Sequence, residues 1–212
     1  MSAHPAWLKP PGPVAPGLRI GLLGGSFNPA HEGHLHVSEV ALKRLGLDYV
    51  WWLVSPQNPL KSSTDMAPLE QRMAWARAAA GRYPPLRVSD IEAQMDTQYT
   101  IDTVRRLKER FPSVHFVWLM GSDNLLAFHR WHDWQRLAMT LPIAIVLRPG
   151  TVLASLTARA ARQFGIGAAQ SERRLATARP PAFAVLDAKR SPASATALRR
   201  RRLGRLKGLV LQ

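Results

Sequence analysis

Short apolar runs that alternate with amphipathic stretches constrain the possible folds of this chain more than any other feature of its sequence. The longer stretches between the apolar runs carry apolar residues at helical spacing, which is typical of strands alternating with helices. We expect strands over Leu18–Leu23, Tyr49–Val54, Leu86–Ser89, Val114–Met120, Ile143–Leu147 and Phe183–Leu186. We expect helices over Gly33–Leu45, Leu69–Arg82, Thr100–Phe111, Thr151–Phe164 and Ala193–Leu206, the last of them strongly basic.

This alternation predicts an α/β fold with a Rossmann-like, doubly wound parallel sheet. A length of 212 residues with 46% hydrophobic residues suits a single domain that ends in a small helical part. We expect a flexible, proline-rich leader over 1–17, one folded domain over 18–203 and a basic tail over 204–212. Ligands of such sheets bind beyond the carboxyl ends of the strands, so the loops after Leu23, Val54, Met120 and Leu147 are the candidate site.

The net charge of +15 first suggests a polyanionic partner such as a nucleic acid. Residues 151–212 hold 13 Lys and Arg against 2 Asp and Glu, so most of the excess lies in the C-terminal third. The chain has no cysteine, which excludes a disulfide framework and a thiolate nucleophile. No apolar run approaches the roughly 20 residues that span a bilayer, so we expect a cytoplasmic protein without a membrane partner.

The first loop reads Gly24-Gly25-Ser26-Phe27 and continues to His31-Glu32-Gly33-His34. We interpret the two glycines as a turn that lets backbone approach a ligand, followed by a helix N-terminus that attracts phosphate. His31 and His34 are three residues apart, so both imidazoles can point toward that anion. The spacing is one residue short of the His-Glu-x-x-His pattern of zinc proteases, and we predict no metal site in the chain.

The His31–His34 segment resembles the (H/T)xGH motif of a nucleotidyltransferase superfamily, in which the histidines bind ATP phosphates. Further segments in the same order resemble bacterial nicotinate-nucleotide adenylyltransferases over about Leu18 to Leu203. These segments are Ser55–Lys61, Tyr99–Thr103, Gly121–Leu125, Trp131–Trp134, Arg148–Gly150 and Ser194–Arg199. The resemblance implies adenylyl transfer from ATP to nicotinate mononucleotide in NAD biosynthesis, with Mg²⁺ accompanying ATP.

The resemblance also implies which residues bind the two substrates. For ATP it implies Gly24, Gly25, Ser26, Phe27, His31, His34, Ser194, Thr196 and Arg199, of which His31, His34 and Arg199 are catalytic. For the mononucleotide it implies Asn58, Lys61, Tyr99, Thr100, Asp123, Trp131 and Arg148.

The mononucleotide residues have separate physical reasons. The nicotinate ring is a pyridinium, which stacks favourably on the face of Trp131, whereas Trp134 is expected in the core. Backbone N–H groups of Tyr99 and Thr100 would bind the nicotinate carboxylate. Lys61 and Arg148 both follow predicted strands and can converge on the phosphate or the carboxylate.

Two alternatives stay open at this point. The acceptor could be nicotinamide mononucleotide or phosphopantetheine, because the histidine motif does not choose the substrate. In a different class, the Arg199–Arg202 run and the basic tail could bind nucleic acid, which is the less favoured interpretation. The sequence makes no prediction of oligomeric state.

Overall fold

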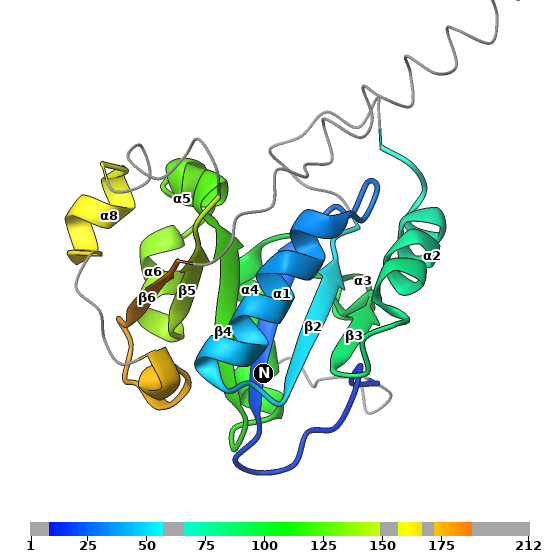
Figure 1. Cartoon of the computed structure of the whole chain (residues 1–212), viewed down its shortest axis with the longest axis horizontal. Coiled ribbons are helices and arrows are strands. Elements are labelled where there is room, and N and C mark those ends of the chain that lie inside the picture. The colour runs from blue at the N-terminus through cyan, green and yellow to red at the C-terminus, as the bar shows by residue number, and fades with distance from the viewer. Residues whose placement is uncertain (1–8, 57–65, 149–156, 167–171, 188–212) are drawn as a thin grey trace, which may run out of the picture.

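The computed structural model describes residues 9–56, 66–148, 157–166 and 172–187 (Figure 1). Six strands form one sheet in the order β3-β2-β1-β4-β5-β6, and every neighbouring pair is parallel. Their bounds are β1 Arg19–Gly25, β2 Tyr49–Val54, β3 Leu86–Ser89, β4 His115–Gly121, β5 Ile143–Val146 and β6 Phe183–Leu186. The predicted doubly wound parallel sheet is confirmed.

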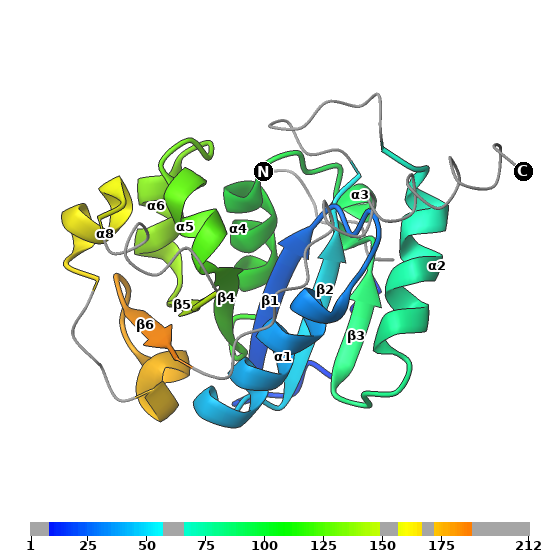
Figure 2. The ribbon, with the colours of Figure 1, turned by 45° about the horizontal axis from the view of Figure 1, so that its top comes forward.

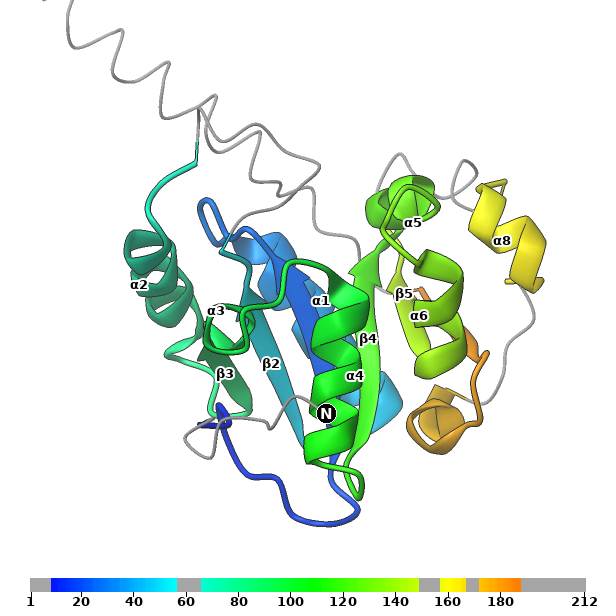
Figure 3. The ribbon, with the colours of Figure 1, turned by 180° about the vertical axis from the view of Figure 1, so that it is seen from behind.

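Helices cover both faces of this sheet (Figures 2 and 3). One face carries α1 (Glu32–Leu45), α2 (Leu69–Ala80) and the short 3-10 helix η1 (Glu172–Thr177). The other face carries α3 (Ile91–Gln94), α4 (Thr100–Arg110), α5 (Ser122–Phe128), α6 (Trp134–Thr140) and α8 (Arg159–Phe164). Within the described ranges, no helix combines the length and apolar character needed to cross a membrane.

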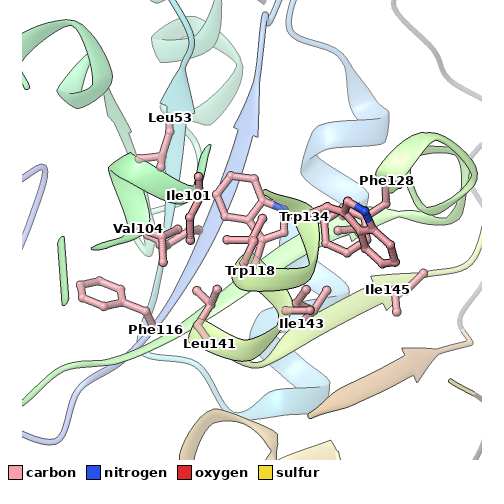
Figure 4. Packing of buried hydrophobic residues seen from close by; sticks show 14 of the residues in the cluster. Leu53, Ile101, Val104, Phe116, Trp118, Phe128, Trp134, Leu141, Ile143 and Ile145 are labelled. Carbon is pink, nitrogen blue, oxygen red and sulfur yellow. The ribbon is translucent and has the colours of Figure 1, made fainter. Parts of the chain in front are cut away.

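The core consists of two clusters, one on each face, because side chains of a strand alternate between its faces. In β4, Phe116, Trp118 and Met120 face α4 and α5, whereas Val117 and Leu119 face α1. Figure 4 shows Trp118 between the α4 side chains and the aromatic pair from α5 and α6. Trp134 is 9% exposed and belongs to this cluster, as expected.

Strand order reverses direction at β1 and β4, which are neighbours in the sheet although far apart in sequence. From β1 the chain proceeds to β2 and β3 on one side, and from β4 to β5 and β6 on the other. Loops that leave the carboxyl ends of β1 and β4 therefore diverge and leave room for a ligand at this switch point.

The two glycines after the first apolar run do not form the turn that we expected. Gly24 and Gly25 are the last residues of β1 and align with Leu53 and Val54 of β2. A Cβ atom on Gly24 would lie 2.6 Å from Cη2 of Trp118, so the large indole of the neighbouring strand requires glycine here. Packing, and not a turn, explains this glycine.

Part of the expected leader packs against the domain. The backbone N–H of Gly17 donates to the carbonyl of Ser113 at 2.8 Å, and Val14 packs against the α4-side core. The packed domain thus begins earlier than residue 18. The described part of the helix expected over Thr151–Phe164 is α8, and the helix expected over Ala193–Leu206 and the tail over 204–212 lie outside the described residues.

Candidate active site

The loop between β1 and α1 places Phe27 beneath the first turn of the helix. Phe27 is 1% exposed, with its ring 5.1 Å from that of Trp52 and 4.5 Å from that of His34. Its backbone has a φ of 46°, a left-handed conformation that is uncommon for a residue other than glycine. Since the Phe27 side chain is core, any contact of Phe27 with ATP must come from its backbone.

The two histidines of the motif cap the N-terminus of α1. Nδ1 of His31, the N-cap residue, accepts from the N–H of Gly33 at 3.0 Å. Nδ1 of His34 accepts from the N–H of His31 at 3.2 Å. This is a capping box in which imidazoles take the places usually held by Ser or Thr and by Glu or Gln.

These caps decide which nitrogen of each imidazole carries the proton. A ring nitrogen that accepts a hydrogen bond has no proton of its own, so each neutral ring carries its proton on Nε2. His31 and His34 therefore both carry their ring proton on Nε2, and their ring centroids lie 3.9 Å apart at the positive end of the helix dipole. The arrangement suits an anion that two donors bind together.

A buried polar contact behind the histidines holds α1 against β2. Nε1 of Trp52 donates to the hydroxyl of Ser38 at 2.8 Å, and that hydroxyl donates to the carbonyl of His34 at 2.9 Å. Both residues are completely buried. Sequence reasoning missed them, because a Trp inside an apolar strand and a Ser inside a helix carry no signal of a shared hydrogen bond.

An ion pair lies at the carboxyl ends of β4 and β5. Nη1 of Arg148 lies 3.3 Å from Oδ2 of Asp123, and the backbone N–H of Arg148 donates to the Ser122 hydroxyl at 2.8 Å. A Cβ atom on Gly121 would lie 2.7 Å from Nε of Arg148 and would also collide with the Asp123 carboxylate. Glycine at position 121 therefore makes room for the pair, and the structure brings two predicted mononucleotide residues together.

The indole of Trp118 lies between Trp131 and the end of β1 at Gly24. The Trp131 ring is edge-on to that of Trp118, with centroids 6.0 Å apart, and also to Phe128 at 5.4 Å. Trp118 is the same residue that packs under Gly24. Trp131 is half-buried, so its ring is fixed by aromatic neighbours at the edge of the core.

Tyr99 and Thr100 begin α4. Tyr99 is the N-cap residue, and its ring stacks on that of His132 with centroids 4.1 Å apart. Helix geometry leaves the first N–H groups of α4 without carbonyl partners inside the helix, which suits the expected contact with a carboxylate. His132, the neighbour of Trp131, was not among the predicted residues.

Glu92 is a buried carboxyl group that sequence reasoning also missed. It is 7% exposed in α3, and burial raises its pKa from the ordinary 4.5 to about 7, although hydrogen bonds from the hydroxyls of Thr103 and Ser55 work against this rise. Thr97 extends the network, with its hydroxyl 2.8 Å from that of Thr103. The network joins the exit of β2 to the first turns of α4.

The structure thus brings the histidine pair, the Trp118–Trp131 aromatic pair and the Asp123–Arg148 ion pair to the carboxyl edge around β1 and β4. The described residues contain no group of three or more His, Asp or Glu side chains that could hold a metal ion. The remaining predicted site residues lie outside the described residues: Asn58, Lys61, Ser194, Thr196 and Arg199.

Comparison with known proteins identifies the family to which the chain belongs. The cytidylyltransferase-like family model matches residues 22–201. A Parvibaculum lavamentivorans protein named "Probable nicotinate-nucleotide adenylyltransferase" is 51% identical over 191 residues, covering 89% of this chain and 94% of that protein. A protein of the same name from Methylorubrum extorquens is 50% identical over 187 residues, covering 87% of this chain and 100% of that protein.

A solved structure of Plasmodium falciparum nicotinic acid mononucleotide adenylyltransferase complexed with NaAD shares the fold, with a TM-score of 0.65 at 16% identity. The match covers 86% of this chain and 83% of that one. Relatives at half identity over nearly their whole length, a family model over most of the sequence and the histidine pair at the switch point agree. The chain belongs to the nicotinate-nucleotide adenylyltransferase family.

Proposed function

We propose that the histidine pair at the start of α1 is the centre at which this family member transfers the adenylyl group of ATP to nicotinate mononucleotide. The products are nicotinate adenine dinucleotide and pyrophosphate, in NAD biosynthesis. The observation that carries this proposal is the capping of His31 and His34 through Nδ1, because it puts the protons of two adjacent imidazoles on Nε2 at the positive end of α1, a position that favours phosphate.

The chemistry is an in-line displacement. An oxygen of the mononucleotide phosphate attacks the α-phosphorus of ATP, a new P–O bond forms, and the bond to the bridging β-phosphate oxygen breaks. The attacking phosphate is already an anion at neutral pH, so the reaction needs no general base. His31 and His34 stabilise the negative charge that develops on the α-phosphate oxygens, and Arg199 is proposed to do the same from the C-terminal segment.

We propose Mg²⁺ as the companion of ATP. Mg²⁺ is commonly held by substrate phosphates with few protein ligands, and no metal-binding cluster occurs among the described residues. When bound, it would neutralise charge on the leaving pyrophosphate. The remaining ATP contacts are assigned to the backbone of Gly24, Gly25 and Phe27 and to Ser26, Ser194 and Thr196.

The acceptor side is built around the first turn of α4 and the Trp131 ring. Trp131 stacks on the pyridinium, and the N–H groups of Tyr99 and Thr100 receive the nicotinate carboxylate. The neutral amide group of nicotinamide mononucleotide would offer these N–H donors no anion. The site therefore favours nicotinate mononucleotide. Arg148, which is paired with Asp123, supplies a positive charge to the acceptor side, and Asn58 and Lys61 are proposed to complete the acceptor site. A cytoplasmic location suits a cysteine-free enzyme that uses ATP.

Substitution of Trp131 by alanine is expected to raise the KM for nicotinate mononucleotide by about 3- to 30-fold, the range of a cation–π contact. The KM for ATP should change little, because Trp131 lies on the acceptor side. Steady-state kinetics with each substrate varied in turn measures both values. Trp131→Phe is the control, since it keeps an aromatic face and contact with Trp118. An unchanged KM for the mononucleotide in Trp131→Ala would contradict stacking.

Pyrophosphate release from ATP in the presence of different acceptors tests the proposed function. We expect the highest kcat/KM with nicotinate mononucleotide, a lower value with nicotinamide mononucleotide and none with phosphopantetheine. Equal or better turnover with either of the other acceptors would overturn the assignment of the substrate.

A further inference from the structure

Arg72 lies in the first turn of α2 and is 1% exposed, yet its guanidinium has no carboxylate partner among the described residues. All four of its hydrogen bonds go to backbone carbonyls. Nε donates to Ala67 at 2.8 Å, Nη1 to Ser26 at 2.8 Å and to Ser55 at 2.6 Å, and Nη2 to Pro56 at 2.8 Å. One side chain thus joins three separate stretches of backbone.

Such a group is costly to keep inside a protein. Burial lowers the pKa of Arg72, which shows that the environment disfavours the charge. A buried cation without an anionic partner gives up hydration that carbonyl dipoles replace only in part. An apolar side chain at position 72 would bury this face of α2 without the cost of a charge, as Ala76 and Ala80 do on the same stripe. The arrangement that Arg72 imposes on the three backbones is therefore its distinctive contribution.

Two of the three backbones border the candidate active site, and the third is the entry to α2. Ser26 lies in the loop that leads to His31, and Ser55 and Pro56 leave the carboxyl end of β2. The N–H of Ala67 donates to Oδ1 of Asn28 at 3.3 Å, which adds a second link between the β1 loop and the entry to α2. The planar guanidinium fixes the mutual angles of these contacts, which a point-like ammonium cannot do.

We propose that Arg72 is a positioning residue for adenylyl transfer, holding the loop that carries His31 in register with the carboxyl end of β2. Arg72 touches no substrate in this assignment, and it acts through the Ser26 carbonyl on the histidine pair. The proposal rests on the proposed function, because it assumes that the histidine pair is the reacting centre.

Arg72→Lys is the decisive variant, because lysine keeps the charge but has one nitrogen in place of three. We expect a folded enzyme whose kcat falls by about 10- to 100-fold, the cost of a small misplacement of reacting groups, with a smaller change in the KM for ATP. Arg77→Lys is the matched control, because Arg77 is exposed in the last turn of the same helix. A folded Arg72→Lys enzyme with wild-type kcat would overturn the proposal, as would a lower melting temperature with unchanged kcat per active site.

Hydrogen exchange of the wild-type protein gives a second test that needs neither turnover nor a stable variant. In increasing denaturant, the backbone N–H groups of residues 26–34, apart from Pro29, and of residues 52–55 should lose protection together, because one side chain binds both stretches. Separate opening of the two stretches would contradict the role of Arg72. Failure of the proposed function would instead appear as absent dinucleotide synthesis in the wild type with this coupled exchange intact.

Discussion

Substitution of His34 by asparagine is expected to lower kcat by about 10²- to 10³-fold, the effect of removing one preorganised donor from a developing oxyanion. Asparagine places an amide oxygen near the position of Nδ1, so it can still accept the N–H of His31 and keep the cap of α1. It lacks a donor at the reach of Nε2. Steady-state kinetics measures the loss, and an unchanged melting temperature shows that the fold is intact.

His34→Gln is the matched control for this experiment. Glutamine reaches as far as Nε2 with an amide N–H, and glutamine at this helix position also caps through its oxygen. We expect it to retain clearly more activity than asparagine. Near-normal turnover of a folded His34→Asn enzyme would show that His34 is not catalytic. Equal losses in both variants would contradict a catalytic hydrogen bond from the Nε2–H of His34.

The Glu92→Gln substitution is expected to remove a large part of the pH dependence of stability. In the folded protein burial raises the pKa of Glu92 to about 7, so between pH 4.5 and 7 the folded state holds a proton that the unfolded chain has lost. The Glu92 contribution is thus fully present below pH 4.5 and is lost as the pH rises through 7. A rise of this size corresponds to about 3 kcal/mol of unfolding free energy.

Urea unfolding of the wild type and Glu92→Gln at several pH values between 4.5 and 8 measures this difference. Relative to the wild type, the variant should gain stability steadily as the pH rises, because glutamine can bond to Ser55 and Thr103 without a charge. Glu70→Gln is the control, since Glu70 is exposed on α2 and should follow the wild type. Parallel stability curves for the wild type and Glu92→Gln would show that the carboxyl group is not held in its neutral form.

The strands could be predicted from the sequence because each is a short apolar run that breakers or polar residues end. β2, β3 and β6 match the predicted bounds. β1 and β4 differ from them by one or two residues at each end, and β5 by one residue at its end. The short helices α3, α5 and α6 were not predicted. Helices of four to seven residues offer too few turns for an apolar period to repeat, so packing on the sheet decides them.

Contacts between distant segments could not be predicted. Gly24 resembled a turn residue in the sequence. The residue that requires glycine there, Trp118, lies on another strand. Arg72 shares a helical stripe with Ala76 and Ala80, and this spacing was the available sign of its burial. Its carbonyl partners lie up to 46 residues away, which no local pattern reveals. The histidine pair was found because both residues and their helix lie within one short motif.

A single-turnover reaction with ATP labelled at the α-phosphorus tests the central claim most directly. With nicotinate mononucleotide as acceptor, the wild type should place the label in nicotinate adenine dinucleotide and release unlabelled pyrophosphate. His34→Asn should form the same product far more slowly. Label that stays in ADP, or in AMP without dinucleotide, would show attack at another phosphorus or by water and would contradict adenylyl transfer to the mononucleotide at this site.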